Sequence, residues 1–206
     1  MDELNLNKAL GDISSIRRQV ARTTEFRGYG PATLAATSAF AVLAGVAQGL
    51  WIPQPASHAG QYVGLWYATA FVSVALAGFQ MYTRSRRIHS GLSDEMIHMA
   101  VEQFLPALGA GLLLSLVLLR AVPEVAWMLP GLWQITFSLG IFASCRFLPR
   151  PIVAAAVWYL FTGLVCIGLG GNRALSPWAM AIPFGVGQML IAGILFASAK
   201  EWRNED

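Results

Sequence analysis

Six long apolar runs, separated by short segments rich in proline, glycine and arginine, are the feature that most constrains this sequence. A helix needs about 20 apolar residues to cross the hydrocarbon core of a bilayer. The runs reach that length and cover roughly residues 31–51, 62–82, 100–119, 126–145, 152–171 and 177–199. Only 12% of the 206 residues are charged, whereas a soluble protein carries about a quarter. The sequence therefore predicts an all-α, polytopic membrane protein with six transmembrane helices.

The basic residues are distributed unequally between the two sides of this topology. Of the fourteen Lys and Arg residues, only Arg120 and Arg173 fall in connections on the side opposite to the N-terminus. Lys and Arg accumulate in the cytoplasmic connections of multi-pass membrane proteins. We therefore expect both termini, including the tail 200–206, to be cytoplasmic.

The polar N-terminal segment, residues 1–30, contains an amphipathic helical pattern over residues 4–24. Leu6, Ile13 and Val20 fall on one face of such a helix, and basic residues fall on the opposite face. One interpretation places this helix flat on the cytoplasmic leaflet, in contact with membrane lipids. The other takes the apolar face as a short coiled-coil seam for a protein partner or for self-association.

A weak internal repeat relates the fourth and sixth runs. Residues 131–146 and 185–200 align without a gap, share five identities and match Gln134 with Gln188. If the similarity is a true repeat, the chain consists of three helical hairpins related by an axis along the membrane normal, as in some transporters. The other interpretation is chance similarity between apolar helices.

Glu102 introduces a carboxylate at the start of the third run, with His98 one helical turn before it and Gln103 beside it. The residues from Gln103 to Leu119 are uncharged and span about 25 Å as a helix. This length places Glu102 at the cytoplasmic interface, where it would pair with arginines. The alternative is a buried functional carboxylate, next to a helix that Pro106 loosens.

Among the uncharged polar or amphipathic residues within the runs, the candidates are Gln134, Gln188, Tyr67 and Trp133. Buried amides in membrane bundles usually tie helices together, at about 0.6 kcal/mol for each hydrogen bond. The alternative is that the two glutamines and Tyr67 face a shared polar path. Trp133 is expected to lie deeper than the other tryptophans, which suit an interfacial belt.

Motifs for catalysis and metal binding are absent from the sequence. His58, His89 and His98 lie in or beside connections, and there is no CxxC, HExxH or phosphate-binding glycine motif. Cys145 and Cys166 are expected near opposite ends of neighbouring helices, too far apart for a disulfide. These observations predict a protein that is not an enzyme, has no cofactor and binds no metal. The net charge of +3 gives no indication of nucleic-acid binding.

Three blocks of the sequence, residues 12–36, 102–111 and 129–149, resemble the recurring blocks of an uncharacterised family of small six-helix bacterial integral membrane proteins. The resemblance implies the bacterial inner membrane, and it transfers no activity and no binding residues. In layout alone, the chain is similar to the acid-resistance-type membrane proteins that are built from hairpin repeats.

Two functions follow from this sequence. The first is a non-enzymatic membrane protein that binds a lipid, a small apolar molecule or a partner protein in an envelope-stress or regulatory role. The alternative is a small transporter or pore with Gln134, Gln188 and Tyr67 along its path. A membrane enzyme that uses Glu102 and His98 is the least favoured hypothesis.

Overall fold

The computed structural model describes residues 31–85, 91–145 and 148–204, and within these ranges the chain is helical with no strand. Six of its helical segments are long and apolar enough to cross a membrane. The six runs expected from hydropathy are therefore confirmed as helices. The amphipathic helix expected over residues 4–24 lies outside the described residues.

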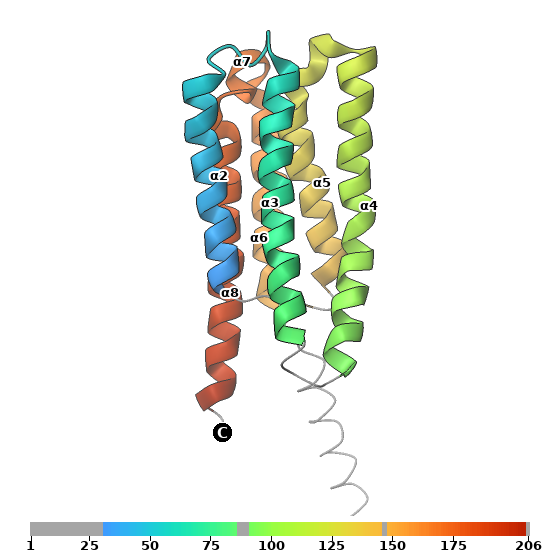
Figure 1. Cartoon of the computed structure of the whole chain (residues 1–206), viewed down its shortest axis with the longest axis vertical. Helices are drawn as coiled ribbons and strands as arrows, with labels where there is room; N and C mark the ends of the chain where they lie inside the picture. Colours follow the sequence, from blue (N-terminus) through green and yellow to red (C-terminus); the bar gives the residue numbers. More distant parts are fainter. Residues whose placement is uncertain (1–30, 86–90, 146–147, 205–206) are drawn as a thin grey trace, which may run out of the picture.

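The six helices run along one long axis (Figure 1). Their bounds are α2 (Pro31–Trp51), α3 (Ala59–Ser85), α4 (Gly91–Ala121), α5 (Leu129–Ser144), α6 (Val153–Leu169) and α8 (Pro177–Asn204). Shorter helical elements are η1 (Pro123–Met128), η3 (Arg150–Ile152) and α7 (Gly171–Ala174). The helix α4 begins well before residue 100, so part of the connection expected after α3 is helical.

Proline and glycine account for several of the helix ends. Pro31 and Pro177 occupy the first positions of α2 and α8, where the missing N–H costs nothing. Gly170 has a φ value of +67° and ends α6, and Gly171 has a φ value of +47° and begins α7, since a residue without a Cβ adopts positive φ readily.

The most extensive helix contacts join α2 to α8 and α5 to α6, whereas α3 and α4 touch each other little. Glycines allow the close approaches. A Cβ on Gly45 of α2 would lie 2.6 Å from the Cβ of Ala181 on α8, and a Cβ on Gly163 of α6 would lie 2.8 Å from the Gly131 carbonyl oxygen. Close packing of small residues is the usual source of helix association in lipid.

The interior contains two clusters of buried side chains. The cluster nearer to α7 includes Tyr62 and Trp66 of α3 together with Leu129 and Met180. The cluster nearer to the C-terminus is formed by α2, α4, α5, α6 and α8, centred on Tyr159, and takes no residue from α3. The helix α3 is therefore anchored in the bundle through its first half.

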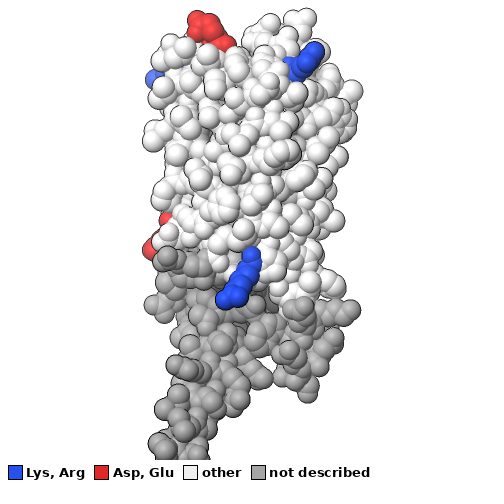
Figure 2. Space-filling model, turned by 180° about the vertical axis from the view of Figure 1, so that it is seen from behind, with Lys and Arg blue, Asp and Glu red and all other residues white. Residues whose placement is uncertain are grey.

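The surface between the two ends of the bundle is apolar. Large side chains such as Phe71, Leu113, Phe161 and Phe196 are exposed along the helices. On the face drawn in Figure 2, charged side chains lie near the two ends, and an uncharged band separates them. This distribution is compatible with a bundle surrounded by lipid.

Candidate functional site: an uncharged hollow at the α7 end

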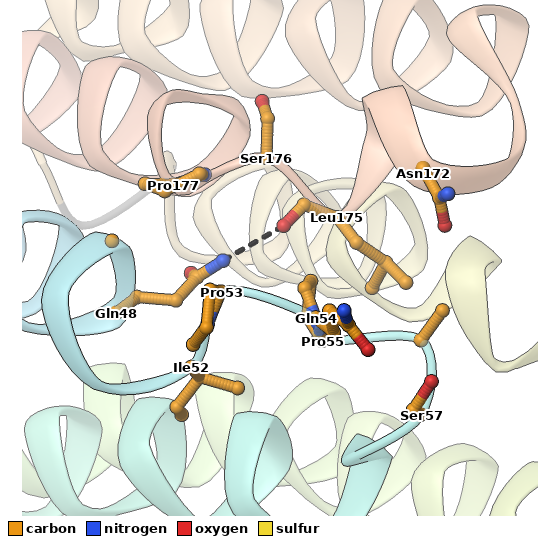
Figure 3. Close-up of a pocket in the computed structure, with 12 residues that line it drawn as sticks. Gln48, Ile52, Pro53, Gln54, Pro55, Ser57, Asn172, Leu175, Ser176 and Pro177 are labelled. Carbon is orange, nitrogen blue, oxygen red and sulfur yellow. Dashed lines mark hydrogen bonds between the residues drawn. The ribbon is translucent and has the colours of Figure 1, made fainter.

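A hollow of about 590 Å³ lies at the end of the bundle that carries α7, between the α2–α3 connection and the turn from α7 into α8 (Figure 3). None of the residues that line it carries a charge at neutral pH. They are Gln48, Gly49, Ile52, Pro53, Gln54, Pro55, Ala56, Ser57, Asn172, Leu175, Ser176 and Pro177.

Gln48 fixes the inner wall of this hollow. Its side chain is fully buried, and its Nε2 donates to the Leu175 carbonyl oxygen at 2.7 Å (Figure 3). Its Oε1 accepts a hydrogen bond from Trp66 Nε1 at 2.9 Å. One amide therefore joins α2 to α3 and to the α7–α8 turn, which fixes the α2 side of the hollow relative to its α7–α8 side.

The α2–α3 connection supplies the opposite wall and holds its own shape. The backbone N–H groups of Ser57 and His58 donate to the carbonyl oxygens of Gln54 and Pro55, both at 3.2 Å. Proline restricts the backbone further, because its ring fixes φ. These bonds and prolines hold the shape of this wall without a contribution from other segments.

The hollow offers hydrogen bonding without charge. The side chains of Gln54, Ser57 and Asn172 are exposed and supply amide and hydroxyl groups. Ile52 and Pro177 add apolar surface. Such a lining favours an uncharged molecule that has both polar and apolar parts.

Tyr67 and Trp133, two of the candidates from the sequence, are brought together by a third residue, Ser115. Tyr67 OH and Trp133 Nε1 each donate to Ser115 Oγ at 2.8 Å, and Ser115 Oγ donates to the Gly111 carbonyl oxygen at 2.8 Å. The Tyr67 and Trp133 rings also contact edge to face, with centroids 5.5 Å apart. This network ties α3, α4 and α5 together.

Gln134 compensates for a proline in another helix. Its fully buried amide donates through Nε2 to the Ala179 carbonyl oxygen of α8 at 2.9 Å. Pro183 lies four residues after Ala179 and has no N–H to offer that carbonyl. The amide of α5 therefore replaces the helical hydrogen bond that Pro183 removes.

Gln188, which the repeat matches with Gln134, has different surroundings. It lies on α8 beside Tyr159 of α6. Gln134 of α5 binds the Ala179 carbonyl of α8, whereas Gln188 is part of α8 and lies beside Tyr159, so the two glutamines have different partners.

Glu102 and Gln103 have exposed side chains, and Glu102 is the first residue of the apolar part of α4, Glu102–Ala121. His98 lies one turn earlier in the same helix. The Glu102 side chain therefore lies on the surface of the bundle and not in its interior. In the described part of the chain, no three His, Cys, Asp or Glu side chains are placed to hold a metal ion, and Cys145 and Cys166 are free thiols.

Neither the hollow nor the role of Gln48 was predicted from the sequence. Gln48 had the same signal as Gln134, a glutamine within an apolar run. The hollow had none, because it is formed by connections that are distant in the sequence.

No family model, curated protein or solved structure matches this chain. The class of protein is therefore defined by the fold alone: a bundle with six helices that are long and apolar enough to span a membrane.

Proposed function

We propose that this is a non-enzymatic, multi-pass membrane protein that binds a lipid or a small, largely apolar molecule without net charge in the hollow at the α7 end. The observation that carries the proposal is the uncharged lining, which combines amides and hydroxyls with prolines around the fixed Gln48. A ligand with a charged group would lose its hydration there without gaining an ionic partner.

The distribution of Lys and Arg supports a bacterial inner-membrane protein whose termini are cytoplasmic. In that orientation the end with α7 faces the outside of the membrane, since the C-terminus lies at the opposite end (Figure 1). The ligand would then reach the hollow from the envelope or from the outer leaflet. This agrees with the envelope-stress or regulatory role expected from the sequence, in which residues 4–24 contact lipids or a partner on the cytoplasmic side.

The alternative is a small transporter, and Pro183 inside α8 favours it, because transport sites often use backbone carbonyls that lack their helical hydrogen bond. However, Tyr67 OH and the Gln134 amide nitrogen are already engaged with Ser115 and Ala179. Two of the three residues expected along a path therefore serve to join helices, and we favour binding over transport.

Native mass spectrometry of the protein released from its own membrane in mild detergent tests the proposal. We expect a discrete bound mass on the wild-type protein, and its loss when Gln54→Leu and Asn172→Leu are combined. Gln103→Leu is the matched control, because Gln103 is also exposed and lies on α4, away from the hollow. A wild-type protein without a bound mass, or a mass that both variants retain equally, contradicts the proposal.

A further inference from the structure

The second half of α3 contains no buried residue, although α3 lies between α2 and α4 at the front of the bundle (Figure 1). From Ala68 to Phe79 every side chain is exposed or half-buried, and none belongs to either interior cluster. This stretch is about 18 Å long as a helix. A large part of α3 therefore presents a face that no other helix of the chain covers.

The exposed face of this stretch has a regular pattern. Ala68, Phe71, Ala75 and Gly78 follow one another at intervals of three, four and three residues, and all four are exposed. This spacing places them in one stripe, as at the a and d positions of two helices that pack along their length. The stripe lies on the side of α3 away from the buried Trp66. We call these four residues the α3 seam.

The α3 seam differs from a face that meets only lipid chains. Three of its four residues are Ala or Gly, and a Cβ on Gly78 would meet no atom within 4 Å. The exposed face of α4, in contrast, carries large aliphatic side chains: Leu105, Leu108, Leu112, Leu113, Leu116 and Val117. Small residues let a second helix backbone approach closely, and this close packing is what associates helices in lipid.

A second copy of α3 fits the seam because the pattern is complementary to itself. Copies with the same orientation in a membrane can be related by a two-fold axis along its normal, so that identical surfaces meet in parallel. Each seam side chain then enters a hole formed by four residues of the facing helix. Phe71, which is 75% exposed, has an alanine on either side along the seam, so small residues leave room for the phenylalanine of the other copy.

The area of this face is sufficient for a specific interface. Phe71 and Phe79 are 75% and 68% exposed and together offer about 300 Å². Val72 and Val74, which flank the seam, are 48% and 58% exposed. With the seam alanines, the face reaches about 500 Å² for each copy, which is half of the area that a specific interface buries at the least. We propose that two copies of this protein associate in the membrane through the α3 seam.

Disulfide cross-linking of the full chain in its native membrane tests the seam. A disulfide needs two Cα atoms within about 7 Å, which only residues close to the two-fold axis satisfy. We expect Ala68→Cys and Ala75→Cys to give a cross-linked dimer on oxidation. Ala70→Cys is the matched control, because Ala70 is exposed but lies off the seam, and it also controls for the native Cys145 and Cys166. Equal cross-linking of the three variants, or none in any of them, overturns the proposal.

Single-molecule photobleaching measures the association without added cysteines. With one fluorophore on each chain in dilute liposomes, we expect two bleaching steps for the wild-type protein and one for Ala75→Leu, which fills the seam. Ala70→Leu should keep two steps. Both alanines are exposed, so neither change enters the interior of the bundle. Equal step counts for the two variants overturn the proposal.

This proposal rests on the proposed membrane location and not on ligand binding, since no seam residue lines the hollow. Flotation of the liposomes separates the two failures. Wild-type protein that floats with the lipid but bleaches in one step overturns the α3 seam alone. Protein that does not float with the lipid overturns the membrane location together with the seam.

Discussion

Gln134→Leu should destabilise the bundle because of a proline in another helix. The substitution removes the only side-chain donor that the structure gives to the Ala179 carbonyl oxygen, at 2.9 Å. Pro183 has no N–H to replace it. The loss of the interhelical bond leaves a partly buried acceptor unpaired, which costs about 1–3 kcal/mol of unfolding free energy. Leu offsets part of this cost, because it also removes the buried Gln134 Oε1, which has no partner among the described residues.

Pro183 makes this prediction specific to one atom, the Ala179 carbonyl oxygen. Pro183→Ala restores an N–H four residues after Ala179, so the helix α8 can satisfy the carbonyl by itself. We therefore expect Gln134→Leu to cost less in the Pro183→Ala background, with a coupling energy of about 1 kcal/mol. Since Leu and Gln have similar sizes, a cavity contributes little to the difference.

Reversible unfolding in mixed micelles with increasing dodecyl sulfate measures the four free energies of this cycle. Gln103→Leu serves as the control for a Gln-to-Leu change at an exposed position of α4. If the costs of Gln134→Leu are equal with Pro183 and with Ala at that position, the reasoning is refuted, because the amide would then stabilise the bundle through some other contact.

Three further predictions concern other parts of the bundle. Gln48→Leu should lower the unfolding free energy by about 1–3 kcal/mol, since it leaves the Leu175 carbonyl and Trp66 Nε1 unpaired. A loss no larger than that of Gln103→Leu in the same unfolding assay contradicts this prediction. Gly163→Ala should lower the unfolding free energy by about 1–3 kcal/mol through overpacking against α5. Gly64→Ala adds a methyl group that meets no neighbouring atom, so it should be neutral or stabilising. Equal effects of the two substitutions would count against the tight α5–α6 contact. Cys145 directly follows α5, at the end of the bundle opposite α7, which the proposed orientation places in the cytoplasm. A membrane-impermeant maleimide should therefore label Cys145 in inverted membrane vesicles and not in intact spheroplasts. The reverse pattern contradicts the proposed orientation.

The six helices could be predicted because membrane thickness sets the length of a spanning helix, and the apolar runs carry this length directly. The pairing of the helices could not be predicted in the same way. Apolar side chains pack as well against lipid as against each other, so hydropathy does not say which helices meet. The contact of α2 with α8 depends on Gly45 and Ala181, whose complementarity is invisible until the helices are placed together.

The same distinction holds for the candidate residues. Gln134, Tyr67 and Trp133 could be identified because a polar group within an apolar run needs a partner. Their partners are a serine and a backbone carbonyl, and a backbone carbonyl is visible in the sequence only where a proline frees it. The clue to the Gln134 contact was Pro183, since a proline inside a helix predicts a free carbonyl four residues earlier.

The buried and the exposed polar groups have different partners, and this difference supports the hollow as the proposed binding site. Buried donors inside the bundle bind backbone carbonyls of neighbouring helices or, for Gln48, of the α7–α8 turn. They include Gln48, Gln134, Ser38 and Ser138. A side chain used in this way cannot also solvate a passing molecule without the loss of a helix contact. Exposed amides and hydroxyls at the α7 end face no such conflict, because a ligand there replaces water rather than a helix. Recognition at that end therefore leaves the interior bonds intact, and a ligand can bind without any movement of the six helices.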